Sequence, residues 1–534
     1  MFGARKRLEN VVENSFGKNP LEGFSFYNAK DRMENVKRFH NQIAGSNTDN
    51  WQVDEITWND LEMDEVFLRI NHTNSFIGEQ MLYHRLHMLT NGKNINQQKK
   101  LEERLEYLEK NTSFRQNIEI QLHHIMKMQT AYYLPEFLLN VDICKIGKQF
   151  IYHVLQLLLL FFFVMGCAVN DVYFAGLIIV ASVNLGIYVV TKQKYDVYFS
   201  SLIELKNIYE FCKWMQKKDK EKVFISASIE SAICKLEKMS KAIVGMSQRQ
   251  QMSMAGDMIA TINEYLWGIF LVDVSAFNYL MKIIVNHHKE VNELMFFAGE
   301  VDADISILSY RQSLDYWCKP KFAEHGINYK AVVHPLINSP VENDFKLFSR
   351  AVITGTNASG KSTFMKSVAI NTILAQTINT CLAEEVTLAA MPVVSCMALR
   401  DDILTGESYY FREAKCLKRI LDLARTQENV LIIIDEILKG TNTKERVAAS
   451  KAIFDFLGKT KSVTIVATHD YELTQNQLYE NYHFNSVIEE DDIVFDYRIH
   501  KGICESSNAI ALLSYLGYPR NLVERAQNYL NENR

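Results

Sequence analysis

The sequence predicts a multidomain protein in which an all-α region with a transmembrane helical hairpin precedes an α/β domain built around a phosphate-binding loop (P-loop). Three observations predict this fold class. Residues 349–363 carry the phosphate-loop pattern, residues 430–436 are typical of a buried parallel strand ending in two carboxylates, and residues 150–190 contain two long apolar runs. The 534 residues, 48% of them hydrophobic, are enough for two or three cores.

The phosphate-loop pattern follows a short β-branched run, residues 352–354, and is bracketed by Gly355 and Gly360. Glycines at this spacing let the backbone N–H groups between them point at an anion. Lys361 is expected to reach the β- and γ-phosphates of ATP, and the Ser362 hydroxyl to bind Mg²⁺. Such a pattern also occurs by chance in long chains, so its downstream partners matter. The predicted loop comprises Gly355, Thr356, Asn357, Ala358, Ser359, Gly360, Lys361, Ser362 and Thr363.

A helix over residues 363–375 follows the loop and adds its N-terminal dipole to the anion site.

Two carboxylates are the first of the downstream partners of the loop. Asp435 and Glu436 end the apolar run of residues 430–436, at the carboxyl end of a predicted strand, where a doubly wound fold places its chemistry. Asp435 is expected to hold the water shell of Mg²⁺, and Glu436 to orient or deprotonate the attacking water.

Two further segments each have a functional and a purely structural interpretation. A second apolar run, residues 463–467, leads to His469, which is placed to sense the γ-phosphate; the alternative is a core strand with an incidental histidine. Residues 401–413 contain a Gly-x-Ser turn that ends at Ser408 and opens a helix. This turn would offer backbone donors and a hydroxyl to an anion, whereas the alternative is an ordinary capped helix start.

The order of these motifs is typical of dimeric ABC-type ATPases, and the residues within them resemble those of the MutS family of DNA mismatch repair ATPases. Residues 354–357 are similar to the family's Thr-Gly-Pro-Asn, with Thr356 in place of proline. Residues 435–443 are similar to its Asp-Glu-Ile-x-x-Gly-Thr-x-Thr segment, and residues 467–473 to its Ala-Thr-His-x-x-Glu-Leu segment. Because the family's closing segment also has a similar counterpart, the resemblance covers at least residues 328–530.

The resemblance implies an ATP hydrolase that binds ATP with Mg²⁺. It gives catalytic roles to Lys361, Glu436 and His469, and it gives Mg²⁺ binding to Ser362 and Asp435.

The resemblance also implies a homodimer with composite sites, in which Ser408 acts in trans on the nucleotide of the partner subunit. The motifs do not place the aromatic side chain that stacks on adenine, and Tyr329 and Phe345 are the candidates considered.

The domain boundaries follow from composition and from the resemblance. Residues 1–50 are polar, predicted to be helical, and too few for a separate globular domain. Residues 51–327 resemble the core or lever domain of the MutS family, and residues 328–534 hold the ATPase domain. Within the core domain, residues 96–130 and 198–212 carry apolar stripes at helical spacing, which predicts structural helix faces.

Residues 150–190 predict a transmembrane hairpin. Each of its two apolar runs has about 20 residues, or roughly 30 Å as helix, which matches a bilayer core. Only Asn170 and Asp171 separate the runs, and lysines flank the two open ends, as the positive-inside rule expects. Asn184, within the second run, is expected to bond across to the partner helix. The alternative is a hairpin buried inside a soluble core.

A third apolar run, residues 265–285, is predicted to be a buried helix of the core domain. Asp273 near its centre would cost roughly 2.5–3.5 kcal/mol on insertion into a bilayer. A single extra crossing would also place the ATPase domain outside the cell, away from ATP. We therefore expect a protein of the cell membrane with both large domains in the cytoplasm. The nine cysteines include no Cys-x-x-Cys pair, which predicts reduced thiols and no zinc site.

Three classes of function remain open at this stage. The first is a membrane-anchored ATPase that couples ATP hydrolysis to DNA binding, as the resemblance implies. The second is a DNA-independent ATP-driven machine for membrane remodelling or signalling. The third, a transporter, is the weakest because two spans per chain are few for a translocation path.

Two departures from the family limit what the resemblance implies about DNA. The mismatch-binding N-terminal domain, with its Phe-x-Glu wedge, has no counterpart, because the first such tripeptide in the chain, residues 322–324, lies beside the ATPase domain. The hairpin also occupies the position where the family's lever helices run toward the DNA clamp. With a net charge of −5 the chain has no bulk attraction to nucleic acid, and a local basic groove stays open as an alternative. Because the mismatch-binding domain has no counterpart and the clamp position is occupied by apolar runs, any DNA binding is expected to be electrostatic and without mismatch specificity.

Overall fold

The computed structural model describes most of the chain and divides it into two compact units. The described residues are 2–22, 30–44, 51–90, 95–139, 148–253, 266–356, 359–397, 409–489, 492–503 and 517–532. The first unit comprises Met1–Ser46, Asn71–His84 and Leu101–Ser309. The second unit comprises Asn47–Ile70, Arg85–Lys100 and Tyr310–Arg534. These units follow tertiary contacts rather than continuous stretches of sequence, and the boundaries 1–50, 51–327 and 328–534 stay predictions.

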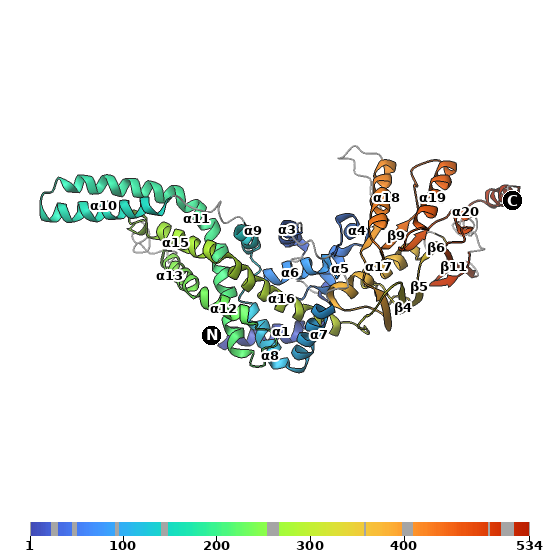
Figure 1. Cartoon of the computed structure of the whole chain (residues 1–534), viewed down its shortest axis with the longest axis horizontal. Helices are drawn as coiled ribbons and strands as arrows, with labels where there is room; N and C mark the ends of the chain where they lie inside the picture. The colour runs from blue at the N-terminus through green and yellow to red at the C-terminus, as the bar shows by residue number, and fades with distance from the viewer. Residues whose placement is uncertain are drawn as a thin grey trace. The chain divides into compact units, whose positions relative to one another are not determined.

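The first unit is helical, as the sequence predicts (Figure 1). The predicted apolar stripes face its interior: Leu105 and Leu108 are buried, and so are Leu202 and Ile208. The helices that lie wholly or partly in this unit are α1 (Phe2–Ser15), η1 (Pro20–Glu22), α3 (Met33–Ile43), α6 (Phe76–His87), α7 (Ile95–Lys110), α8 (Thr112–Leu122), η2 (Ala131–Tyr133), α9 (Leu134–Leu139), α10 (Gln149–Ala168), α11 (Tyr173–Lys218), α12 (Ala227–Lys235), α13 (Glu237–Ser253), α15 (Val272–Asn286) and α16 (His288–Gln312).

A buried carboxylate fixes the start of α6 against α16. Asp302 on α16 is fully buried and accepts hydrogen bonds from the backbone N–H groups of Asn74 (2.9 Å) and Ser75 (2.7 Å) and from Ser75 Oγ (2.5 Å). Gly78 makes this approach possible, because a Cβ atom there would lie 2.1 Å from Asp302 Oδ2. The N-terminus of α6 is thus joined to α16 through its free N–H groups and one buried acceptor.

Helices α10 and α11 form the predicted antiparallel hairpin (Figure 1). The whole of α10 and the Tyr173–Thr191 part of α11 are long and apolar enough to cross a membrane, and only 17% of each apolar stretch is buried. The alternative of a hairpin buried inside a soluble core is therefore not found. Glycines let the helices approach near the tip, since a Cβ at Gly176 would lie 2.5 Å from the ring of Phe162.

Two expectations about this region need correction. Asn184 does not bond across to α10; its Nδ2 donates to the backbone oxygen of Ile269 (2.7 Å). The third apolar run is only half buried. One face of α15, with Phe277 and Leu280, is buried, whereas Tyr279 is 51% exposed. The prediction of a buried helix holds for one face of α15 and not for the other.

The second unit contains a mainly parallel six-stranded sheet with the order β12-β11-β6-β10-β9-β8, a four-stranded sheet with the order β3-β7-β4-β5, and the short pair β1-β2. Strands β11, β6, β10, β9 and β8 run parallel, and β12 is antiparallel to β11. The strands are β1 (Trp51–Gln52), β2 (Met88–Leu89), β3 (Lys321–Ala323), β4 (Ile327–Val332), β5 (Asn343–Leu347), β6 (Arg350–Thr354), β7 (Glu385–Ala389), β8 (Val393–Cys396), β9 (Leu431–Asp435), β10 (Val463–Ala467), β11 (Glu480–Glu489) and β12 (Asp492–Lys501).

The parallel register brings three strand ends to one edge of the large sheet. Ala467 at the end of β10 pairs with Ile353 of β6 on one side and with Asp435 of β9 on the other. Loops that follow β6, β9 and β10 therefore converge there, as in doubly wound folds. The remaining helices of this unit are α4 (Glu55–Asp60), α5 (Met63–Ile70), α17 (Lys361–Ile378), α18 (Tyr409–Thr426), α19 (Thr443–Leu457), α20 (Tyr471–Thr474) and α22 (Arg520–Glu532).

A segment from the N-terminal part of the chain packs on the outer strand of this sheet. Asp60 of α4 is buried, and its Oδ2 accepts from Ser395 Oγ (2.7 Å) and from the N–H of Met397 (2.9 Å). Asp54, at the start of α4, pairs with Arg419 of α18. Burial raises the pKa of the Asp60 carboxyl. The predicted core domain includes this segment, and its Asp60 and Asp54 contact the edge of the six-stranded sheet and α18.

Candidate nucleotide site

The phosphate loop has the backbone that its glycines predict. Gly355 and Gly360 have φ angles of +137° and +98°, a region that side-chain-bearing residues seldom adopt. A Cβ at Gly355 would also lie 3.0 Å from the backbone oxygen of Phe484. Both dihedral angle and space therefore require glycine at this position. The Ser359 Oγ closes the loop by donating to the oxygen of Thr356 (2.7 Å). Asn357 and Ala358, which belong to the predicted loop, lie outside the described residues.

Lys361 begins α17 with its ammonium group turned back over the loop. The residue is 3% exposed, and its Nζ donates to the backbone oxygens of Gly355 (2.6 Å) and Thr356 (2.8 Å). A buried positive charge next to a loop of this kind suits the phosphates of a nucleotide. Thr363, the last residue of the predicted loop, has an exposed side chain on the first turn of α17.

Ser362 and Asp435 are brought into direct contact from two elements of the fold. Ser362 Oγ, on α17, donates to Asp435 Oδ2, at the end of β9, over 2.5 Å. A hydroxyl and a carboxylate are hard oxygen donors of the kind that bind Mg²⁺, so the side chains present fit that ion. Within the described ranges no group of three His, Cys, Asp or Glu side chains could hold a metal.

Glu436 stands at the centre of a short chain of charged groups. Its φ is +63°, and its N–H donates to the oxygen of Ala467 (2.9 Å), which ties the end of β9 to the end of β10. Its Oε1 lies 3.3 Å from His469 Nε2, and its Oε2 lies 3.4 Å from Lys439 Nζ. The hydrogen bond from His469, with the nearby Lys439 charge, lowers the pKa of Glu436 despite partial burial. Glu436 is therefore a carboxylate at neutral pH.

Two residues of this cluster were not singled out from the sequence. Lys439, on the turn after β9, holds the second oxygen of Glu436. Glu413, a buried carboxyl on α18, accepts the N–H of Lys439 over 3.1 Å, and burial raises its pKa. Glu413 thereby fixes the turn that carries Lys439. The signal in the sequence that could have identified Glu413 is a charged residue on the inner face of the helix that the Gly-x-Ser turn opens.

An ion pair holds the turn that carries His469. Arg446 of α19 meets Asp470 with two hydrogen bonds, from Nε to Oδ2 (3.0 Å) and from Nη2 to Oδ1 (2.6 Å). The N–H of Asp470 donates to Thr468 Oγ1 (3.0 Å). Because a bidentate pair fixes orientation as well as distance, Arg446 sets the position of the residue next to His469.

The aromatic candidates for adenine stacking were wrong. Tyr329 and Phe345 are 1% and 2% exposed, so neither offers a ring face to a ligand, and the Tyr329 hydroxyl is engaged with Thr372 Oγ1 at 2.8 Å. Tyr497 of β12 lies beside the loop instead: a Cβ at Gly360 would be 3.1 Å from its Cδ1. Tyr497 is 46% exposed and has a left-handed φ of +52°. An exposed ring and a strained backbone next to the loop mark it as the available aromatic.

Asn343 holds Tyr497 in this place. Its Nδ2 donates to the oxygen of Tyr497 (3.1 Å), and its Oδ1 accepts the N–H of Ile499 (2.8 Å). The predicted Gly-x-Ser turn cannot be placed in the same way, because Ser408 lies outside the described residues, which resume at Tyr409, where α18 begins.

These contacts define a class. A glycine loop between β6 and α17, together with Asp435 at the end of β9, a parallel strand separated from β6 by β10, makes a P-loop nucleotide-binding domain. Residues 351–533 match the family described as MutS domain V, and this part of the chain is an ABC-type ATPase domain. An ATPase domain of this type implies ATP and Mg²⁺ in general terms.

Curated relatives are distant and share only part of their length. The chain is 31% identical over 258 residues to the "DNA mismatch repair protein MutS" of Natronomonas pharaonis, with 45% of this chain and 29% of that protein covered. It is 29% identical over 279 residues to "DNA mismatch repair protein MutS 2" of Haloarcula marismortui (46% and 29%). It is also 29% identical over 269 residues to the "DNA mismatch repair protein MutS" of Thermotoga petrophila (48% and 34%). The chain thus spans about a third of these relatives or less.

The Arg446–Asp470 pair yields a prediction about turnover. Replacing Arg446 with methionine keeps most of the side-chain volume but removes the bidentate contact, so the turn with His469 should loosen. We expect kcat for ATP hydrolysis to fall about tenfold, equivalent to about 1.4 kcal/mol, with little change in KM. Arg446→Lys keeps the charge without the planar fork, so its kcat should lie between those of the unmodified protein and Arg446→Met. Steady-state phosphate release measures both constants.

The control for this prediction is Arg425→Met, the same substitution at an exposed position late in α18. It should leave kcat and KM unchanged. An Arg446→Met enzyme with the kcat of the unmodified protein would contradict a positioning role for this ion pair.

Proposed function

We propose that the protein is a membrane-anchored ATPase that binds ATP with Mg²⁺ and hydrolyses it as a homodimer. The observation that carries the proposal is the contact between Ser362 Oγ and Asp435 Oδ2. It joins the phosphate-loop helix to the end of β9, and it puts two Mg²⁺-binding oxygens beside the buried ammonium of Lys361. Packing of the sheet alone does not require a hydroxyl, a carboxylate and a buried ammonium group at the carboxyl ends of its strands, which is where doubly wound folds bind ligands.

Each group has a role in binding. The loop N–H groups and the Lys361 ammonium hold the phosphates, while Ser362 and Asp435 hold Mg²⁺, which neutralises charge on the phosphate oxygens. The ring of Tyr497, next to Gly360, stacks on the adenine. This position replaces the two buried aromatics considered from the sequence.

Glu436 acts on the attacking water. As a carboxylate it accepts a hydrogen bond from the water, orients it, and takes its proton as the water oxygen bonds to the γ-phosphorus, while the bond from the γ-phosphorus to the bridging oxygen breaks and ADP leaves. His469 and Lys439 each contact one oxygen of Glu436. The Glu436 side chain is therefore already ordered before ATP binds. From its turn at the end of β10, His469 is also the residue placed to contact the γ-phosphate.

The homodimer would complete each site. Ser408 directly precedes α18, and we propose that this serine reaches the nucleotide of the partner subunit. Glu413 supports such a link, because it connects α18 of one chain to the turn that carries Lys439 beside Glu436. Helix α18 would then contact the nucleotide of the partner subunit through Ser408 and hold the turn with Lys439 through Glu413.

The hairpin would anchor the protein in the cell membrane. Its exposed surface is apolar along both helices, with Phe150, Leu157 and Ile178 each at least 65% exposed. An even number of crossings returns the chain to the side from which it entered. Both large parts of the chain would therefore lie in the cytoplasm, where ATP is available, with the tip at Asn170 and Asp171 on the other side.

Glu436→Gln tests the catalytic assignment. The amide keeps the size of the side chain but accepts no proton, so ATP binding should persist while kcat falls by about 100-fold or more. Binding is measured with a fluorescent ATP analogue and turnover by phosphate release. Because ATP would stay bound, the variant should also form a dimer on adding ATP with Mg²⁺, detected by light scattering in detergent.

Glu428→Gln is the matched control, since Glu428 is exposed on the surface and pairs with Lys461. It should keep full turnover. Undiminished hydrolysis by Glu436→Gln would remove Glu436 from the catalytic role, and a monomer at saturating ATP would remove the composite site while leaving the assignment of Glu436 intact.

A second candidate function, ATP-linked DNA binding, is favoured by the names of the matched relatives. We expect duplex binding by this chain to be electrostatic, so it should weaken steeply with salt and ignore a mispaired base. Titration of a homoduplex and a single-mismatch duplex at physiological salt measures this. A tenfold preference for the mismatch, about 1.4 kcal/mol, would restore the repair interpretation. No binding to either duplex would favour a DNA-independent role in membrane remodelling or signalling.

A further inference from the structure

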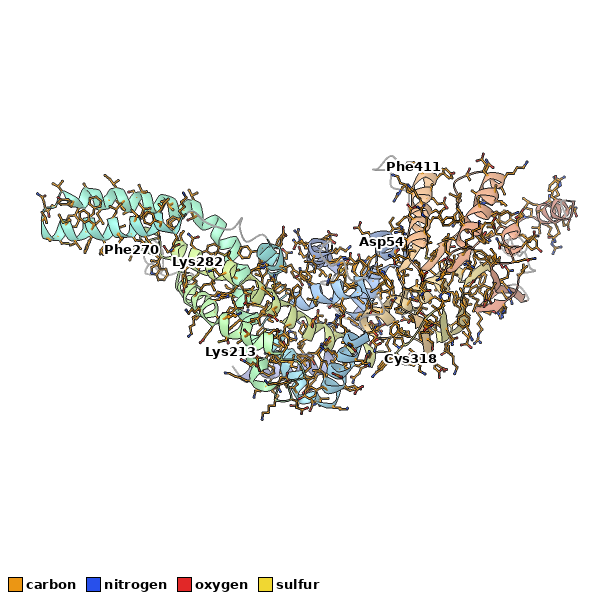
Figure 2. The ribbon with its side chains drawn as sticks, in the orientation of Figure 1. Asp54, Lys213, Phe270, Lys282, Cys318 and Phe411 are labelled. Atoms are coloured by element: carbon orange, nitrogen blue, oxygen red, sulfur yellow. The ribbon has the colours of Figure 1, made fainter. Side chains whose placement is uncertain are left out.

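Two amide side chains within the apolar hairpin are turned toward the same short segment. Gln156 of α10 donates from Nε2 to the backbone oxygen of Phe270 (2.8 Å) and to Ser275 Oγ (3.1 Å). Asn184 of α11, which is fully buried, donates from Nδ2 to the backbone oxygen of Ile269 (2.7 Å). Each helix of the hairpin therefore supplies one donor to two consecutive carbonyl groups. Figure 2 shows Phe270 beside α10.

The two carbonyl groups lie at a break between helical turns. Leu271 has a left-handed φ of +50°, and α15 begins after it at Val272. The last carbonyls before such a break lose their partners within the helix and need other donors. Gly268 allows the break to approach the hairpin closely, because a Cβ there would lie 2.7 Å from Tyr188 Cδ1. The docking thus depends on a glycine and on two amides, not on apolar packing alone.

The position of these amides sets the depth of the break. Gln156 is seven residues from the start of α10 at Gln149, and Asn184 is seven residues before Thr191, the end of the apolar part of α11. Seven residues of helix rise about 10 Å. The hydrocarbon core of a bilayer is about 30 Å thick. If the hairpin spans the bilayer, the carbonyl groups of Ile269 and Phe270 therefore lie about a third of the way across the hydrocarbon core.

The chemistry of the segment agrees with that depth. Unpaired carbonyl groups cost several kcal/mol each in hydrocarbon, so irregular backbone is tolerated there only where protein satisfies it. Gln156 and Asn184 provide that satisfaction. The side chains that remain exposed are apolar: Leu266 is 45% exposed and Phe270 is 42% exposed.

We propose that residues 266–271 form a re-entrant membrane element, which dips among the lipid acyl chains beside the hairpin and is held there by Gln156 and Asn184. The proposal rests on the proposed membrane anchoring of the hairpin. A segment that enters and leaves on one side adds no crossing, so it keeps the ATPase domain in the cytoplasm. Asp273, two residues beyond the element, lies on the buried face of α15 and is 9% exposed, so it faces protein and not acyl chains.

Trp267, within the element, is a natural reporter. The full-length protein is reconstituted into phosphatidylcholine vesicles with brominated acyl chains, which quench tryptophan on contact, and vesicles are isolated by flotation. We expect strong quenching in the unmodified protein that is largely lost in Trp267→Phe. Trp214→Phe, which removes a tryptophan on α11 beyond its apolar part, is the matched control and should keep the quenching.

A second variant separates docking from anchoring. Gln156→Leu with Asn184→Leu makes the hairpin more apolar, so flotation should be unchanged, while quenching should drop to the level of Trp267→Phe because the break loses its donors. Protein that floats with equal quenching in the unmodified and Trp267→Phe forms would overturn the re-entrant element and leave the anchor standing. Full quenching in the double variant would overturn the role of the two amides. Protein that does not float would overturn the anchor and the element together.

Discussion

The contact between Ser362 and Asp435 depends on the order of the strands, and the rest of the nucleotide site depends on that contact. Strand β10 lies between β6 and β9, so the loop after β6 and the carboxylates after β9 face each other across one strand end. The N–H of Glu436 bonds to Ala467 of that same strand. A change in strand order would leave every motif in the sequence and remove the site.

Backbone groups that lack partners within a helix or strand explain features in both units. In the phosphate loop, Gly355 and Gly360 have φ angles of +137° and +98°, which allow a backbone whose N–H groups bind an anion. At the start of α6, the same kind of free N–H group is satisfied by buried Asp302. Beside the hairpin, two carbonyl groups at a helix break are satisfied by Gln156 and Asn184. Polar residues in apolar surroundings therefore mark places where the main chain is interrupted.

Local patterns made the phosphate loop, the Asp435–Glu436 pair, the hairpin and the buried leucine stripes predictable, because each is encoded within a few turns or one strand. Long-range contacts were not predictable. Tyr497 reaches Gly360 only through the non-sequential order of β12, β11 and β6, and its strand gives no hint of it. The partner of Asn184 lies 85 residues away, across a break with no motif of its own. The two aromatic candidates considered from the sequence, Tyr329 and Phe345, are core residues, since alternation along a strand buries every second side chain.

The central claim is that ATP hydrolysis and a membrane anchor belong to one chain. The most direct measurement is flotation of the reconstituted full-length protein through a density gradient after a high-salt wash, with Mg²⁺-dependent phosphate release assayed in every fraction. The account predicts that protein and activity rise together with the lipid and that removal of Mg²⁺ abolishes the activity. Protein and activity that remain together in the lipid-free fractions, or floated protein that releases no phosphate, would contradict it.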